Sequence, residues 1–151
     1  MNYITRHFTM EEFIATNHRN IDNTLPIELH GNAMQTCEMM ERIRTYLSKV
    51  TGRDTAINPS SAYRCLTLNR AVGSSDSSDH VKGLAMDWNA QGLTPFEACR
   101  LLEPVVNELG IGQLIHEYGR WVHTGVPKPL KMVNRIITIS SAGTDVGIKY
   151  V

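Results

Sequence analysis

The chain has 151 residues, 42% of them hydrophobic, with 15 basic and 15 acidic side chains that balance to a formal net charge of zero. A chain of this length is expected to form one domain with a sizeable core. The scattered basic residues provide no surface for gripping nucleic acid, and no apolar run is long enough for a signal peptide or a membrane span. We therefore expect a single domain over residues 1–151, made in the cytoplasm, that neither binds nucleic acid nor inserts into a membrane.

The first half of the chain carries signals for two helices. Thr9 and Glu12 form a capping box, which predicts a short helix that runs to about Asn17. Apolar residues at helical spacing then predict the principal packing helix over about residues 32–50, and Gly52 follows as a stop signal.

The second half alternates between strand and helix patterns. A second capping box at Thr94, with proline at the first helical position, predicts a helix that ends before Gly110. Alternating or β-branched segments predict strands over residues 84–89, 113–118, 121–124 and 135–139. The expected fold class is α+β, with a small antiparallel sheet that carries the functional site and packs against two or three helices.

The three cysteines are odd in number, far apart and surrounded by apolar residues (Cys37, Cys65 and Cys99). They show no Cys-x-x-Cys spacing of the kind that binds metal or forms a redox pair. We interpret all three as core thiols.

Three side chains have the character of metal ligands: His80, Asp87 and His123. Gly83 lets the chain turn from the Ser-rich loop into the strand at 84–89, so His80 is expected over the polar face on which Asp87 lies. His123 must then come from a neighbouring strand. Two imidazoles and a carboxylate match a catalytic zinc site, which keeps three protein ligands and leaves the fourth position to water. This donor set predicts a hydrolase.

The segments around these ligands resemble a known family. Residues 78–87 read Ser-Asp-His-Val-Lys-Gly-Leu-Ala-Met-Asp, which is similar to the Ser-x-His-x-x-Gly-x-Ala-x-Asp signature of the zinc D-alanyl-D-alanine carboxypeptidases. Trp-Val-His at 121–123 resembles the second metal segment of that family, and residues 61–73 resemble its Ser-Gly-Tyr-Arg region with Ala62 in place of the glycine. Phe-Thr-Met-Glu-Glu-Phe at 8–13 is similar to a segment of the short phage-encoded peptidoglycan peptidases in this family.

This resemblance implies that His80, Asp87 and His123 bind Zn²⁺. It implies that Arg64 faces a substrate carboxylate or a developing oxyanion, a role that suits the planar, permanently charged guanidinium. The implied substrate is the peptide stem of bacterial peptidoglycan, with phage-mediated host lysis as the setting, either as a free enzyme or as part of a virion. The motifs do not separate a D-Ala-D-Ala carboxypeptidase from an endopeptidase that cuts an L-Ala-D-Glu bond or a cross-bridge. We expect the protein to act as a monomer.

Peptide hydrolysis also needs a general base. In several branches of the family a glutamate lies three residues before the last histidine, where this chain has Arg120. Glu117 is the natural substitute, because Gln-Leu-Ile-His-Glu at 113–117 resembles a Gln-x-Ile-x-Glu strand of the phage-type branch.

The turn that follows Glu117 decides between two bases. A two-residue turn pairs His116 with His123 and favours His116, because opposed residues of a hairpin point to one face. A three-residue loop over 118–120 places Ile115 opposite His123, so Glu117 shares the metal face. We predict Glu117 as the base, with His116 as the alternative.

Two rival functions remain open from the sequence. The first is a non-catalytic virion or wall-binding module that retains the zinc fold, and Arg120 at the usual base position is its best support. Its weakness is that a structural zinc site usually closes with four protein ligands. The second rival is an amidase or another zinc hydrolase.

Overall fold

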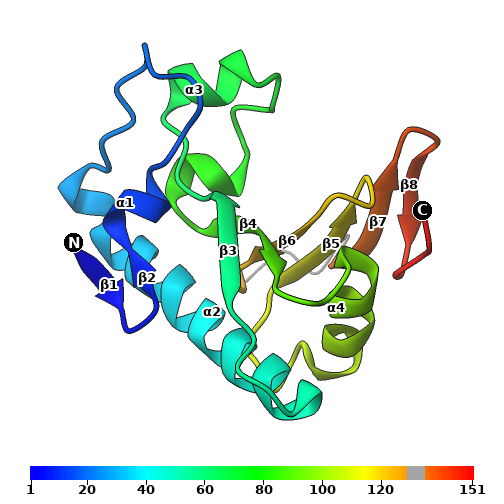
Figure 1. The fold of residues 1–151 in the computed structure, drawn as a ribbon. Coiled ribbons are helices and arrows are strands. Elements are labelled where there is room, and N and C mark those ends of the chain that lie inside the picture. The colour runs from blue at the N-terminus through cyan, green and yellow to red at the C-terminus, as the bar shows by residue number, and fades with distance from the viewer. Residues whose placement is uncertain (129–134) are drawn as a thin grey trace.

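The computed structural model describes residues 1–128 and 135–151, and within them the chain forms two sheets flanked by helices (Figure 1). The strands are β1 (Tyr3–Thr5), β2 (Phe8–Thr9), β3 (Ile57–Ser61), β4 (Ala85–Ala90), β5 (Gln113–Glu117), β6 (Trp121–Gly125), β7 (Ile136–Ser140) and β8 (Gly143–Val146). The α-helices are α1 (Met10–Phe13), α2 (His30–Thr51), α3 (Leu66–Ala71) and α4 (Pro95–Leu102). Three 3-10 helices accompany them: η1 (Ile27–Leu29), η2 (Asp79–Lys82) and η3 (Glu103–Val105).

The larger sheet has the order β3-β4-β6-β5-β7-β8, and β1 pairs with β2 in a separate hairpin. Neighbouring strands of the larger sheet run antiparallel, except that β5 and β7 are parallel. The α+β class is confirmed, while the expected antiparallel sheet is a mixed one.

The capping boxes form as predicted, but tertiary contacts set where the first helix ends. Thr9 Oγ1 accepts a hydrogen bond from the Glu12 amide at 3.2 Å, and Glu12 Oε1 accepts one from the Thr9 amide at 3.0 Å. The helix was expected to reach Asn17, and that expectation is wrong because α1 ends at Phe13. The Phe13 carbonyl accepts instead from the Tyr63 amide and the Ile14 carbonyl from the Asn23 side chain, so both are directed to other segments of the chain.

The two longer helices also begin close to their predicted positions. Gly52 follows α2 in the left-handed conformation, with φ 73°, as a stop signal requires. The helix that starts at Pro95 was expected to continue to residue 109, but α4 ends at Leu102. Pro104 lacks a backbone N–H and cannot continue the α-helical pattern, so the chain tightens into η3.

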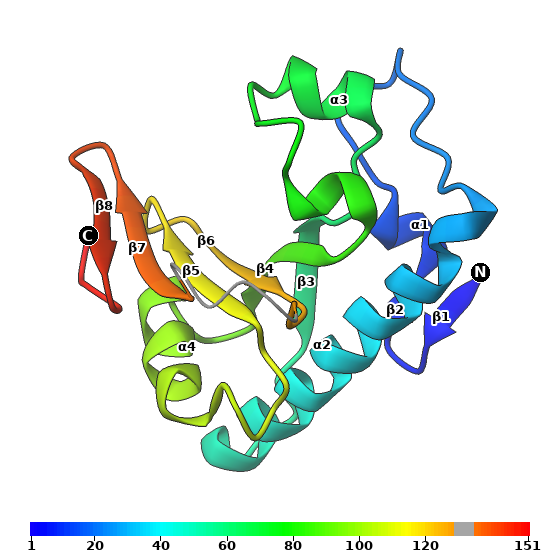
Figure 2. The ribbon, with the colours of Figure 1, turned by 180° about the vertical axis from the view of Figure 1, so that it is seen from behind.

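Helices α2 and α4 cover one face of the larger sheet, as Figure 2 shows from behind. Even-numbered residues of the central strands point to this face and are buried in the core: Met86, Trp88, Leu114, His116, Val122 and Thr124. The Trp88 indole donates a hydrogen bond to Thr124 Oγ1 at 2.9 Å, which in turn donates to Met40 Sδ of α2 at 3.3 Å. Strand alternation therefore directs the odd-numbered residues, including Asp87, Glu117 and His123, to the face that these helices leave open.

The cysteines divide into two kinds. Cys37 and Cys99 lie in the core with 0% exposure, and burial raises the pKa of the Cys37 thiol to about 12. Cys65 is half-buried and packs against the edge of the core, and its Sγ also accepts a hydrogen bond from the Leu68 amide and caps α3.

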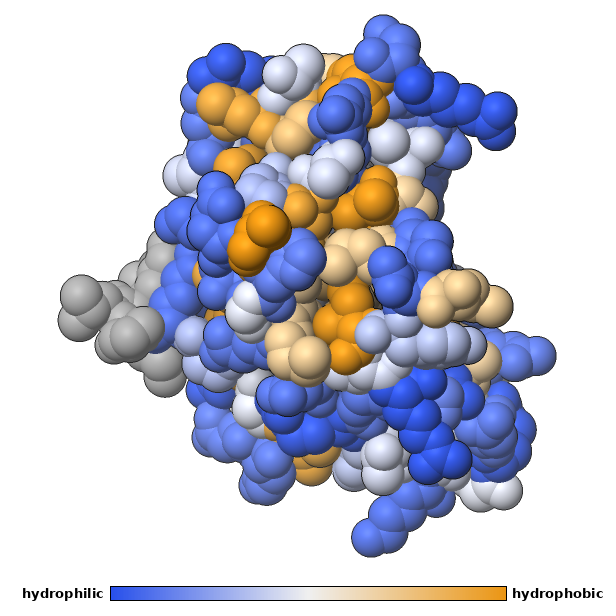
Figure 3. Space-filling model, turned by 90° about the vertical axis from the view of Figure 1, so that its left-hand side faces the viewer, coloured by the Kyte–Doolittle hydropathy of each residue, from blue (hydrophilic) through white to orange (hydrophobic). Residues whose placement is uncertain are grey.

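On the face seen in Figure 3, hydrophilic residues dominate and apolar residues gather in small separate groups. Across the described parts of the chain, none of the helices combines the length and the hydropathy needed to cross a membrane.

Candidate metal centre

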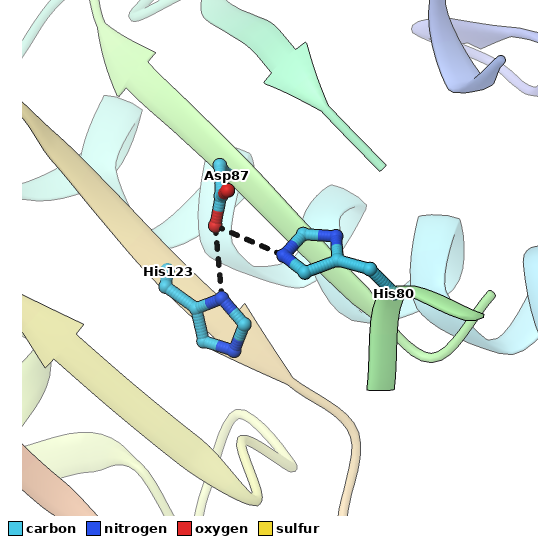
Figure 4. A group of neighbouring side chains, drawn as sticks. All are labelled: His80, Asp87 and His123. Carbon is cyan, nitrogen blue, oxygen red and sulfur yellow. Dashed lines mark hydrogen bonds and ion pairs between the residues drawn. The ribbon is translucent and has the colours of Figure 1, made fainter. Parts of the chain in front are cut away.

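Three elements bring the predicted ligands together. His80 lies in η2, Asp87 lies in β4, and His123 lies directly opposite Asp87 in β6. Gly83 ends η2 in the left-handed conformation, with φ 69°, and turns the chain from His80 into β4. Figure 4 shows the result, in which dashed lines join the Asp87 carboxylate to both imidazole rings.

The geometry of this cluster suits a single cation. One potential ligand atom from each side chain lies within 4.8 Å of the other two. Asp87 Oδ1 is 2.8 Å from His123 Nδ1 and 3.3 Å from His80 Nε2, and all three side chains are buried. The cluster can therefore bind a metal ion with two nitrogen donors and one carboxylate.

The surroundings of His80 fix which of its nitrogens faces the cluster. His80 Nδ1 lies 2.6 Å from the Ala62 carbonyl oxygen, and because that oxygen can only accept, Nδ1 carries the proton. In the neutral ring, Nε2 then presents a lone pair toward Asp87. Two acceptors, Nε2 and a carboxylate oxygen, converge on the same space, and a cation there satisfies both. The donor set thus fits a metal ion.

Burial and charge shift the pKa values of the cluster in different directions. Desolvation lowers the pKa of His80 and favours the neutral ring that a metal requires. Burial alone would raise the pKa of Asp87, but the adjacent His80 and His123 outweigh it and lower that pKa below its ordinary value. Burial alone would lower the pKa of His123. The hydrogen bond between His123 and Asp87, together with the negative charge of the nearby Glu117, outweighs burial and raises this pKa overall.

The register of the β5–β6 hairpin places Glu117 beside this cluster. Glu117 pairs with Trp121 and Ile115 pairs with His123, as the three-residue loop predicts. The loop needs left-handed backbone at Tyr118 and Gly119, with φ 55° and 66°. Glu117 Oε1 consequently lies 3.6 Å from His123 Nδ1. Burial, followed by the charge of Asp87, raises the pKa of Glu117, which is the direction a general base needs.

His116, the alternative base, lies on the opposite face of the sheet. It is 1% exposed, its ring packs against Phe96 of α4, and its Nδ1–H donates to the Lys149 carbonyl at 2.9 Å. The structure therefore brings Glu117 to the cluster and separates His116 from it.

Arg64 completes the charged groups around the cluster. Its backbone amide donates to the His80 carbonyl at 3.0 Å, which ties it to the loop of a candidate ligand. Desolvation lowers the pKa of its guanidinium, while Asp87 and Glu117 oppose that shift, so the side chain stays a cation close to both carboxylates.

A cleft of about 470 Å³ opens over the cluster, and its walls include Arg64, Glu117, Trp121 and Ile139. It adjoins a second hollow of about 340 Å³, lined by residues 15–18, Ser60 and Ser61, and the two share Arg64, Val72, Asp87 and Trp121. Nothing in the sequence indicated that the Ala62 carbonyl binds His80, because a backbone acceptor leaves no signature in residue type. Nor did the sequence indicate a role in the site for Ile139, although the strand that carries this residue was predicted.

The comparison with family models decides the relationship of this chain to known proteins. The model described as Peptidase M15 matches residues 6–125, which are 120 of the 151 residues. The chain belongs to the peptidase M15 family. The match spans His80, Asp87, His123, Arg64 and Glu117, and it supports a metallopeptidase. A comparison with curated proteins gives no significant match.

Proposed function

We propose that this M15 peptidase is a zinc enzyme that hydrolyses the peptide stems of bacterial peptidoglycan. The observation that carries the proposal is the convergence of a buried His-Asp-His cluster, a carboxylate and an arginine on one cleft. His80, Asp87 and His123 would hold the zinc ion. When bound, zinc polarises a carbonyl and lowers the pKa of a water ligand to about 7.

The protein side chains would supply the proton transfers and the charge stabilisation. Glu117, beside His123, would accept a proton from the attacking water as its oxygen bonds to the scissile carbonyl carbon. It would then return the proton to the amine as the C–N bond breaks. Arg64 would stabilise the negative charge that develops on the carbonyl oxygen.

Among the bond specificities that the motifs leave open, the cleft favours an endopeptidase. Arg64 lines both the cleft and the adjoining hollow bordered by residues 15–18, so the space available to a peptide does not stop at the cleft. A peptide with residues on both sides of the cut bond needs such a continuation, whereas a carboxypeptidase needs a cleft that stops at the terminal carboxylate. Lysis of the host cell by a bacteriophage is the setting that the resemblance of residues 8–13 to the phage-encoded peptidases supports.

Digestion of purified peptidoglycan followed by mass spectrometry tests this function. We expect new termini at a single internal bond of the stem or cross-bridge, one equivalent of bound zinc, and loss of the products in His123→Ala or after chelation. Release of only terminal D-alanine would establish a carboxypeptidase instead. A wild-type protein that binds zinc and cell wall but releases nothing would identify a non-catalytic binding module.

A further inference from the structure

Asn23 makes an unusual set of hydrogen bonds next to the cleft. It is only 6% exposed, and its side-chain amide bridges two chain segments. Nδ2 donates to the carbonyl oxygens of Ile14 and Tyr63, both at 2.9 Å, and Oδ1 accepts from the Cys65 amide at 2.7 Å. The Asn23 side chain thus holds the backbone immediately before and immediately after Arg64.

The guanidinium of Arg64 has no comparable anchor of its own. Within residues 1–128 and 135–151 it makes no hydrogen bond or salt bridge, and its Nε is buried without a partner. Apart from the attraction of the Asp87 and Glu117 carboxylates, the position of the long side chain therefore depends on the backbone from which it projects. That backbone is held by Asn23 on both sides and by the bond from the Arg64 amide to His80.

We propose that Asn23 is a positioning residue for Arg64: by bonding Tyr63 O and Cys65 N, it fixes the direction in which the guanidinium enters the cleft. The inference rests on the proposed function, because it assigns Asn23 a role in the same reaction. A small displacement of a charge-stabilising group is costly, and misplacement by about 1 Å can lower a rate about 100-fold. We therefore expect Asn23→Ala to lower kcat/KM about 10- to 100-fold with zinc content unchanged.

A purely structural role for Asn23 makes a different prediction, and a double-mutant cycle with Arg64→Ala separates the two. If Asn23 acts through Arg64, Asn23→Ala has little further effect once the guanidinium is gone. If Asn23 only stabilises the fold, its effect is the same in both backgrounds, because independent effects multiply to within about twofold. Thr55→Val is the matched control, since it removes partly buried hydrogen bonds to Thr51 and Arg53 near the opposite end of β3.

The experiment that tests this proposal has two measurements. The double-mutant cycle is measured as kcat/KM on soluble stem peptides, and the NMR signal of the Arg64 Nε–H group is recorded in the zinc-loaded protein. We expect Asn23→Ala to shift that signal and to reduce kcat/KM in wild type but not in Arg64→Ala, while Thr55→Val changes neither. If Asn23→Ala does not fold, the same cycle is measured with Asn23→Ser, which retains one hydrogen-bonding group.

Two results would overturn the inference: equal losses of kcat/KM in both backgrounds, or an Arg64 signal that does not move when Asn23 is replaced. An inactive wild-type protein would instead refute the proposed function. In that case the Arg64 signal still decides whether Asn23 positions the guanidinium.

Discussion

Replacement of Glu117 by glutamine is the sharpest test of the proposed chemistry. Glutamine keeps the size of the side chain and its place in β5 but cannot accept a proton from water. General acid–base catalysis contributes about 10²- to 10⁴-fold to a rate, or about 3 to 5 kcal/mol of transition-state stabilisation. Glu117 lies on the metal face with its side chain 18% exposed and 3.6 Å from His123, so we expect Glu117→Gln to lose at least about 100-fold in kcat.

The stability of this variant gives an independent check on the same reasoning. Asp87 lies close enough to raise the pKa of Glu117, which means that the two carboxylates repel each other. Removal of the charge on Glu117 relieves that repulsion in the metal-free protein. Glu117→Gln should therefore keep its fold and its zinc content, with a Tm equal to or above that of wild type.

His116→Gln is the matched control, because it alters the neighbouring residue of the same strand on the opposite face. It removes the bond to the Lys149 carbonyl and the contact with Phe96, so we expect a loss of about 1 to 3 kcal/mol in the free energy of unfolding. Its kcat should stay close to that of wild type. The assignment of the base is refuted if Glu117→Gln stays within tenfold of wild type while His116→Gln is inactive.

Three further predictions concern the metal and the stability of the fold. Asp87→Asn should weaken zinc binding by more than about 100-fold in a competitive titration, and chelation should then lower the Tm of wild type but not of the variant. Gly83→Ala should cost about 1 to 2 kcal/mol in urea unfolding, because φ is 69° there while the added Cβ meets Phe13 at an ordinary 3.7 Å; an unchanged midpoint would contradict this. Burial alone would raise the pKa of Glu41, but hydrogen bonds from His7 and Thr5 lower it, so this carboxylate stabilises the fold at neutral pH and loses that effect as the pH falls. Glu41→Gln should therefore be less stable by about 1 to 2 kcal/mol at pH 7, and its difference from wild type should shrink as the pH falls below 4.5, the ordinary pKa of a glutamate; a constant difference would count against it.

Local signals in the sequence predicted the first residues of the helices better than their last residues. A capping box acts within four residues, so Thr9 and Thr94 mark where α1 and α4 begin. The end of α1 depends on the Tyr63 amide, which lies far along the chain and leaves no trace in the helical pattern. The end of α4 had a local cause in Pro104, which hydrophobic spacing through residue 109 obscured.

The sheet shows the same limit. Strands β4, β5, β6 and β7 follow from alternation and β-branched residues, but β3 and β8 were not predicted. The sequence INPSS of β3 contains a proline and polar residues, and it becomes a strand because it pairs with β4 at the sheet edge. Parallel pairing of β5 with β7 is likewise a long-range choice that no local pattern encodes.

The sequence by itself determined which side chains are able to bind a metal, because His80, Asp87 and His123 are recognisable from residue type and from the motif around Gly83. Only the tertiary structure decided which acid or base accompanies them. A shift of one residue in the β5–β6 register would exchange Glu117 for His116, since neighbouring strand residues point to opposite faces. Hydrogen bonds to backbone atoms, such as those of Ala62 with His80 and of Asn23 around Arg64, were also beyond the sequence, because every residue carries the same backbone groups.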